Sequence, residues 1–142
     1  MSRYCFTIIF LSILFGCVNP AHRPKDLGNG YQLILNGVDD RGIVDDREIF
    51  AIYGHVVDYR FDSVYIIAIE RPRDSVPECD GLPWQEQNKI FYASSFKQYW
   101  IINKINGQKW GPYNYQKYLL RRREIGVPED LKLSTNYNSR SY

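Results

Sequence analysis

Short runs of β-branched and aromatic residues, separated by turn residues, constrain the fold of this chain more than any other feature. Three such runs follow one another at residues 48–53 (EIFAIY), 55–61 (HVVDYRF) and 64–69 (VYIIAI). These side chains favour strands because they fit a pleated, half-buried surface. Since only a few residues separate the runs, they predict an antiparallel meander.

The middle run also predicts which side of its strand is buried. Apolar and charged side chains alternate from Val57 to Asp62, and successive side chains of a strand point to opposite faces. We therefore expect a half-buried strand with Asp58 and Arg60 on the polar face. The runs on either side are apolar throughout, which is typical of strands covered on both faces.

A further strand and a hairpin are predicted outside this meander. Residues 31–35 (YQLIL) form a first strand, and residues 98–103 (QYWIIN) reach a turn that contains Asn106-Gly107. Such a turn predicts a hairpin to a returning strand at residues 108–110. We expect Gly111-Pro112 to break the sheet.

Two segments are predicted to be loops. The first, Asp39 to Glu48, is highly charged, and the second, residues 71–87, contains three prolines. Residues 89–95 are compatible with either a short strand or a helical turn.

The apolar spacing changes after residue 113. Tyr115, Tyr118 and Leu119 fall near one face of a helix. Asn114 is a suitable N-cap, and Gly126 is a suitable residue just past the helix end. The pattern predicts one helix of about 11 residues, the usual length in globular proteins.

Together these segments predict an α+β fold: an antiparallel β-meander of five to seven strands with one C-terminal helix packed on it. A composition of 44% hydrophobic and 24% charged residues is that of a globular chain. We expect a single domain over residues 31–133, followed by a polar tail at residues 134–142.

The amino-terminal segment resembles a bacterial lipoprotein signal peptide. Residues 5–15 are uncharged and largely apolar, but this run is too short for a spanning helix, which needs about 20 residues. Leu14-Phe15-Gly16-Cys17 resembles the lipobox, although Phe15 is larger than the residue usual there. The resemblance implies that the signal peptidase recognises Leu14 and Gly16 and removes residues 1–16. Cys17 would then carry the lipid, and residues 17–30 would be a flexible tether. An ordinary secretory signal or an uncleaved anchor are the alternatives.

The order of the strand motifs resembles that of small uncharacterised lipoproteins of Bacteroides-type bacteria, whose folded part is a domain of unknown function. The matching segments lie at residues 30–33, 56–59, 65–68, 99–104 and 111–113. The resemblance implies this architecture and a lipid anchor, and it brings no catalytic residue with it.

Few side chains suggest catalysis or metal binding. His55 and Cys79 could form a nucleophilic pair, but the carboxylates on either side of Cys79 disfavour a thiolate. Ligands for zinc are too few. Oxygens of the Asp39–Glu48 segment could bind Ca²⁺, but the interleaved arginines favour a solvated loop. We therefore predict no catalytic residue, no metal and no cofactor.

A possible interaction surface comprises Trp84, Arg121, Arg122 and Arg123. Trp84 stands in a predicted loop, and the tryptophans and the twelve tyrosines could form an aromatic platform for a glycan. Aromatic residues at strand spacing are more often core, and a run of arginines is more often the solvated face of a helix.

These features predict a membrane-anchored envelope lipoprotein that is a non-catalytic binding or protein-interaction module. A small envelope hydrolase and a passive structural lipoprotein are the alternatives. The expected partners are the lipid bilayer, through acylated Cys17, and another envelope protein or a glycan. A net charge of +2 is too small to indicate nucleic acid. Because no acidic run follows Cys17, the expected location is the outer membrane, facing the periplasm.

Overall fold

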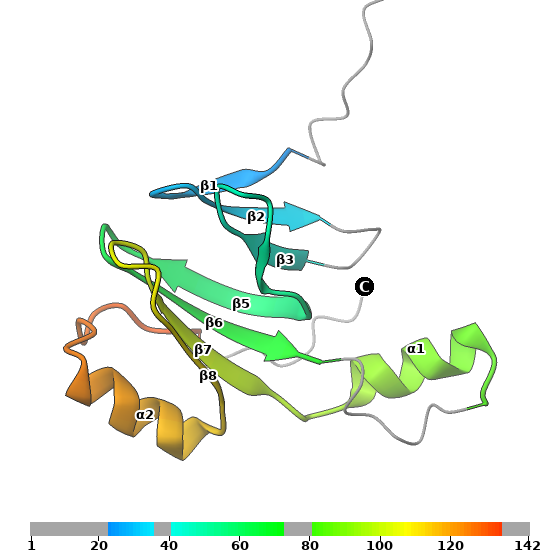
Figure 1. Cartoon of the computed structure of the whole chain (residues 1–142). Helices are drawn as coiled ribbons and strands as arrows, with labels where there is room; N and C mark the ends of the chain where they lie inside the picture. The colour runs from blue at the N-terminus through cyan, green and yellow to red at the C-terminus, as the bar shows by residue number, and fades with distance from the viewer. Residues whose placement is uncertain (1–22, 36–40, 73–80, 135–142) are drawn as a thin grey trace, which may run out of the picture.

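Two antiparallel sheets pack around a shared core in the computed structural model, which describes residues 23–35, 41–72 and 81–134 (Figure 1). The first sheet contains β1 (Lys25–Gly28), β2 (Tyr31–Leu35), β3 (Arg41–Val44) and β4 (Phe50–Ile52). The second contains β5 (His55–Phe61), β6 (Tyr65–Arg71), β7 (Gln98–Asn103) and β8 (Lys109–Tyr113). The helices are α1 (Trp84–Ala93) and α2 (Tyr115–Glu124).

The predicted α+β class and the meander are confirmed, because each strand pairs antiparallel with the next strand of its sheet. The predicted number of five to seven strands is too low. The described residues form eight strands, and they form two sheets in place of one.

Two of the additional strands lie in segments that the sequence assigned to irregular structure. β1 falls inside the predicted tether 17–30, so the folded unit begins before residue 31. β3 falls inside the predicted charged loop Asp39–Glu48. Both strands are short and have polar neighbours, yet each places a fully buried residue in the core, Leu27 in β1 and Ile43 in β3.

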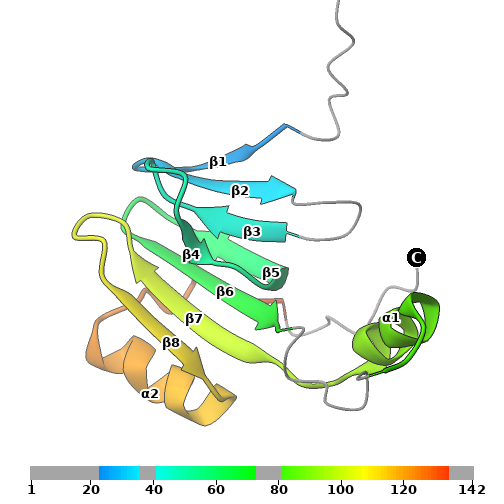
Figure 2. The same ribbon diagram turned by 45° about the vertical axis from the view of Figure 1, so that its right-hand side comes forward.

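The second sheet is covered on both faces, which divides the molecule into three layers (Figure 2). Ile66 of β6 faces the first sheet and packs with Leu27 and Ile43. Its neighbour Ile67 faces the other way and packs with Tyr118 of α2. The apolar character of this run therefore follows from burial on both sides, as expected.

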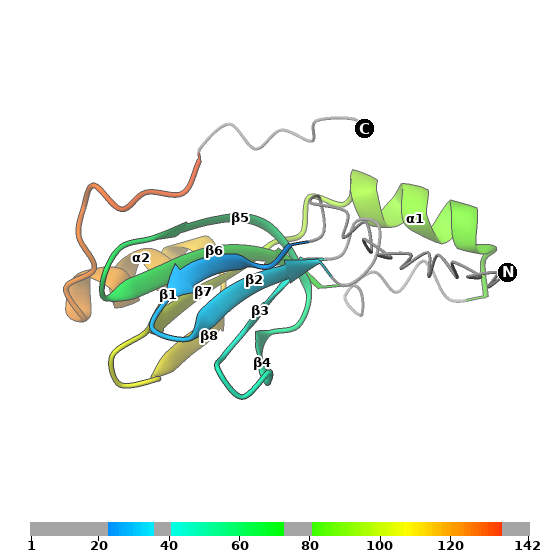
Figure 3. The same cartoon turned by 90° about the horizontal axis from the view of Figure 1, so that it is seen from above.

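The first half of β5 differs from the predicted half-buried strand. A register irregularity lies between Val56 and Asp58, and Asp58 is only 7% exposed. The segment after α2 runs back beside β5 (Figure 3). Its Ser134 backbone N–H donates to Oδ2 of Asp58 at 2.6 Å. Asp58 is buried because this returning segment covers it.

Helix α1 was predicted only in part. Its residues 84–87 fall in a predicted loop, and a helical turn was one of two alternatives for residues 89–95, because prolines precede the helix and its apolar spacing is weak. Its one buried residue is Phe91, and the ring of His55 lies 5.8 Å from the Phe91 ring. The helix lies at the opposite end of the second sheet from α2 (Figures 1 and 2). The described residues therefore contain two full helices where the sequence predicted one.

Helix α2 forms where the sequence placed it. The side chain of Asn114 accepts a hydrogen bond from the Lys117 backbone N–H at 2.9 Å, as an N-cap does, and Gly126 follows the helix with φ +72°. The break expected at Gly111-Pro112 is wrong, since β8 continues to Tyr113. β8 is an edge strand, where the missing N–H of a proline is tolerated. Neither helix is long and apolar enough to cross a membrane, within the described ranges.

Candidate functional site

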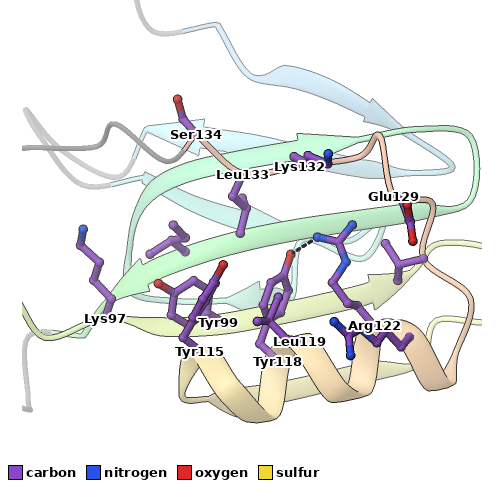
Figure 4. Close-up of a pocket in the computed structure, with 13 residues that line it drawn as sticks. Lys97, Tyr99, Tyr115, Tyr118, Leu119, Arg122, Glu129, Lys132, Leu133 and Ser134 are labelled. Carbon is purple, nitrogen blue, oxygen red and sulfur yellow. Dashed lines mark hydrogen bonds between the residues drawn. The ribbon is translucent and has the colours of Figure 1, made fainter.

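A pocket of about 730 Å³ lies between α2, the second sheet and residues 127–134, which we call the strap (Figure 4). The volume lies within the range typical of small-molecule sites, about 300–1,000 Å³. The lining residues are Ile69, Lys97, Tyr99, Tyr115, Tyr118, Leu119, Arg122, Arg123, Val127, Glu129, Lys132, Leu133 and Ser134.

Three tyrosines form one wall of the pocket. Tyr115 and Tyr118 are three residues apart in α2 and share a helix face. Their rings lie 5.3 Å and 5.1 Å from the ring of Tyr99 in β7. Burial is the main cause that raises the pKa of Tyr99 and of Tyr118. Both hydroxyls therefore remain protonated hydrogen-bond donors at neutral pH.

Arg122 holds the strap against the helix. Its Nη2 donates to the backbone carbonyls of Pro128 and Leu131, each at 2.8 Å, and its Nη1 donates to the Tyr118 hydroxyl at 3.3 Å. The guanidinium carbon also lies 5.7 Å from the centre of the Tyr118 ring. Arg122 is therefore a structural part of the wall.

The pocket lining carries more positive than negative charge. Among the described lining residues the cations are Lys97, Arg122, Arg123 and Lys132, and the one carboxylate is Glu129. Arg123 and Lys132 form no ion pair with another described residue. An excess of positive charge at a concave site favours anionic ligands.

The structure separates the residues of the predicted interaction surface. Trp84 begins α1 and is 61% exposed, at the far end of the molecule from the arginines. Arg121 pairs with Glu124 at 2.9 Å on the outer side of α2. Only Arg122 and Arg123 line the pocket. Sequence reasoning missed Lys97, Tyr99 and Lys132 as site residues. The Tyr115–Tyr118 spacing is a signal for the tyrosine wall, but such spacing equally indicates core packing.

The remaining candidate residues give no second site among the described residues. His55 is buried against the Phe91 and Tyr92 rings of α1. No three His, Cys, Asp or Glu side chains within the described ranges gather as metal ligands. Leu14, Gly16, Cys17, Cys79, Asp39 and Asp40 lie outside the described residues.

Asp45 belongs to the Asp39–Glu48 segment, whose oxygens could bind Ca²⁺. In the structure its carboxylate caps a turn. Its Oδ1 accepts the backbone N–H groups of Arg47 and Ile49 at 3.0 Å, and its Oδ2 accepts the Arg47 guanidinium at 2.5 Å. The hydrogen bond from Arg47 lowers the pKa of Asp45. Its oxygens are therefore engaged within the loop.

A buried carboxylate lies at a second place, between the two sheets. Glu70 accepts hydrogen bonds from the Trp100 indole N–H and the Gly54 backbone N–H, and it is 7% exposed. Burial is the main cause that raises its pKa. Trp100 is thus partly buried and packs against the core between the sheets.

The family model described as Protein of unknown function (DUF3997) matches residues 28–137. The chain belongs to the DUF3997 family. The matched residues include β2 to β8, both helices and the strap, so the pocket lies wholly within the DUF3997 domain. No curated protein gives a significant match to the chain. No solved structure does so either.

Proposed function

We propose that this DUF3997 protein is a lipid-anchored, non-catalytic binding module of the cell envelope, related to small lipoproteins of Bacteroides-type bacteria. The observation that carries the proposal is the tyrosine-walled, cationic pocket beneath the strap. Concave sites with an apolar wall and a few converging polar groups are the usual form of a small-ligand site.

The chemistry of the pocket supports binding over catalysis. A general acid or base works best when its pKa lies near the operating pH. Burial moves the pKa values of Tyr99 and Tyr118 upward, away from neutrality. These groups are suited to donate hydrogen bonds to a ligand and unsuited to exchange protons with it.

The proposed anchor is Cys17, after removal of residues 1–16. Because β1 begins at Lys25, only seven residues separate the lipidated cysteine from the folded unit. An extended chain of that length spans at most about 30 Å. The folded unit would therefore stay close to the membrane surface, in our proposal the periplasmic face of the outer membrane.

The anchor is tested by growing cells with an alkynyl fatty acid and measuring its incorporation into the protein. We expect labelling of the wild type and none of the Cys17→Ser variant. Labelling of both proteins, or of neither, would contradict the proposed attachment.

The binding role is tested by placing a photo-crosslinking amino acid at Glu129, an exposed position of the strap that lines the pocket, or at Gln32, an exposed position of β2. After irradiation of intact cells, mass spectrometry identifies what is attached. We expect adducts from position 129 only, and fewer of them when Cys17 is replaced. Equal adducts at both positions, or none at 129, would argue against a binding pocket.

A further inference from the structure

We propose that the pocket binds an acidic sugar, meaning a pyranose ring that carries a carboxylate or a phosphate group. This inference rests on the proposed binding function and names the ligand class for the same site. It follows from the hydrogen-bond donors, the charge and the apolar surface that meet beneath the strap.

Two hydroxyl donors face the cavity without a partner among the described residues. The hydroxyls of Tyr99 and Tyr115 make no hydrogen bond there, and Figure 4 shows both tyrosines extending from β7 and α2 into the space under the strap. The two hydroxyls lie near enough that charge on Tyr115 contributes to the raised pKa of Tyr99. Paired donors of this kind suit the oxygens of a hydroxylated or anionic ligand.

The cations at the rim select for negative charge. Arg123 and Lys132 are exposed and form no ion pair within the described ranges, while Arg122 is already engaged with the strap carbonyls. Lys97 extends the positive charge to the other end of the pocket (Figure 4). Hydrogen bonds between a cation and a carboxylate or phosphate are about twice as strong as neutral ones. An anionic group on the ligand would therefore contribute more to binding than a neutral group.

Apolar groups line the pocket together with these donors. Ile69, Leu119 and Leu133 contribute aliphatic groups, and the tyrosines contribute rings, of which Tyr115 is 49% exposed. The C–H groups of a pyranose form an apolar face that packs on an aromatic ring, while the hydroxyl groups of the sugar remain available to polar donors. A sugar ring thus matches both the apolar and the polar groups of the lining.

A fatty acyl chain matches the pocket less well. An acyl chain would cover the Tyr99 and Tyr115 hydroxyls and the nearby cations without offering them hydrogen bonds. Burying polar groups in this way carries a free-energy penalty of about 1–3 kcal/mol for each group. The mixed lining therefore favours a polar ring over a lipid tail.

The test measures binding to the full chain, purified in an uncharged detergent that contains no sugar. Isothermal titration calorimetry compares glucuronic acid, glucose 6-phosphate, glucose and lauric acid. We expect at least one of the two acidic sugars to bind about tenfold or more tightly than glucose and lauric acid at low salt, and to weaken as salt is added. The stronger of the two identifies the anionic group as carboxylate or phosphate.

Substitutions connect any binding to the pocket. The double variant Arg123→Gln, Lys132→Gln should bind the acidic sugar about tenfold more weakly, and Tyr115→Phe should lower the affinity by a smaller factor. Lys117→Gln is the matched control, because Lys117 is on the same helix but its ammonium lies 4.9 Å from the Tyr113 ring, outside the pocket lining. Unfolding midpoints of all variants verify that each one folds.

Several results would overturn the assignment. They are equal binding of glucose and the acidic sugars, tighter binding of lauric acid, no binding of either acidic sugar, and binding that the double variant leaves unchanged. If crosslinks still form at position 129 in cells while neither acidic sugar binds, the pocket is a binding site but the ligand class is wrong. If the crosslinks are also missing, the proposed function fails as well.

Discussion

At the scale of single residues, the pocket depends on a guanidinium whose hydrogen bonds are made within the protein. Arg122 donates to two strap carbonyls and to a buried tyrosine hydroxyl, a set of directions that the planar fork of arginine can satisfy and a lysine cannot. Without it, the strap would keep the apolar contacts of Val127 and Leu131 and the hydrogen bond from Ser134 to Asp58. Polar and apolar contacts therefore both hold the wall of the site.

We expect the Arg122→Ala variant to lose about 1–3 kcal/mol of unfolding free energy, because two strap carbonyls lose a charged donor. Urea unfolding measures the loss, and amide hydrogen exchange should accelerate in residues 127–134. Arg121→Ala is the control, with a loss below about 0.5 kcal/mol, since Arg121 forms only an exposed pair with Glu124. Equal losses in the two variants would contradict the role given to Arg122.

The buried carboxylate of Glu70 should make the free energy of unfolding depend on pH. Burial raises its native pKa above the ordinary 4.5, so the folded chain binds this proton more tightly than the unfolded chain does. Its contribution to stability is therefore present below about pH 4.5 and is lost as the pH rises through the native pKa.

The comparison with Glu70→Gln isolates this effect. Relative to that variant, the wild type should be more stable at about pH 4 than at about pH 7, as measured by urea unfolding. Glu124→Gln removes an exposed carboxylate and is the control. A difference between wild type and Glu70→Gln that does not change with pH would refute the argument.

Part of the site could be predicted from the sequence at this scale. Tyr118 and Arg122 are four residues apart, which places them on one helix face, while Arg121 points elsewhere. That spacing distinguishes the arginine of the wall from its neighbours. The contributions of Lys97 and Lys132 were not accessible, because they depend on where β7 and the strap meet in space.

At the scale of elements, long apolar runs were predictable and short strands were not. The strands β5 and β7 match their predicted bounds, and α2 has the predicted cap. β1 and β3 are each only four residues long and have polar neighbours in the sequence, so local composition does not reveal them. β1 forms a strand by pairing with β2, and β3 does so by pairing with β2 and β4. Local periodicity in the sequence does not reveal such pairing.

The hairpin of β7 and β8 depends on Gly111. Its φ is +137°, and a Cβ atom there would lie 2.5 Å from Cε3 of Trp100 and 2.8 Å from the Tyr99 carbonyl oxygen. We expect Gly111→Ala to lower the unfolding free energy by about 3 kcal/mol or more, from the combined backbone strain and steric overlap.

Gly126→Ala provides the matched control in the same urea measurements. Gly126 also has a positive φ, +72°, but no atom lies within 4 Å of a Cβ placed there. The loss should be about 1 kcal/mol, from backbone strain alone. Equal losses at the two glycines would show that contact with Trp100 does not matter.

At the scale of the whole molecule, the second sheet is the layer that both cores share. The sequence predicted strands that are buried on both faces, but it did not predict which elements cover each face. Periodicity shows which side chains of a strand are buried, and it does not show what they pack against. The sequence therefore predicted one sheet with a helix packed on it, where the described residues form two sheets. The position of the pocket, between the shared layer and α2, could not be predicted for the same reason.

The amino-terminal strand belongs to this architecture. Leu27 is fully buried between the sheets, and the ammonium of Lys104 donates to its carbonyl oxygen at 2.5 Å. We expect Leu27→Ala to lower the unfolding free energy by about 2–5 kcal/mol. The control Gln32→Ala, at an exposed position of β2, should change it by less than about 0.5 kcal/mol. A small loss at Leu27 would place β1 outside the cooperative fold.

The chain order of the strands has a consequence for how the molecule assembles. Every strand in both sheets pairs with its neighbour in sequence, so little chain entropy is lost in closing the loops. A chain that emerges amino-terminus first could complete the ladder from β1 to β4 before residue 55 is free. The inner face of that ladder would then remain uncovered until β5, β6 and β7 arrive. This interval is when nascent chains are most prone to aggregate and most in need of a chaperone.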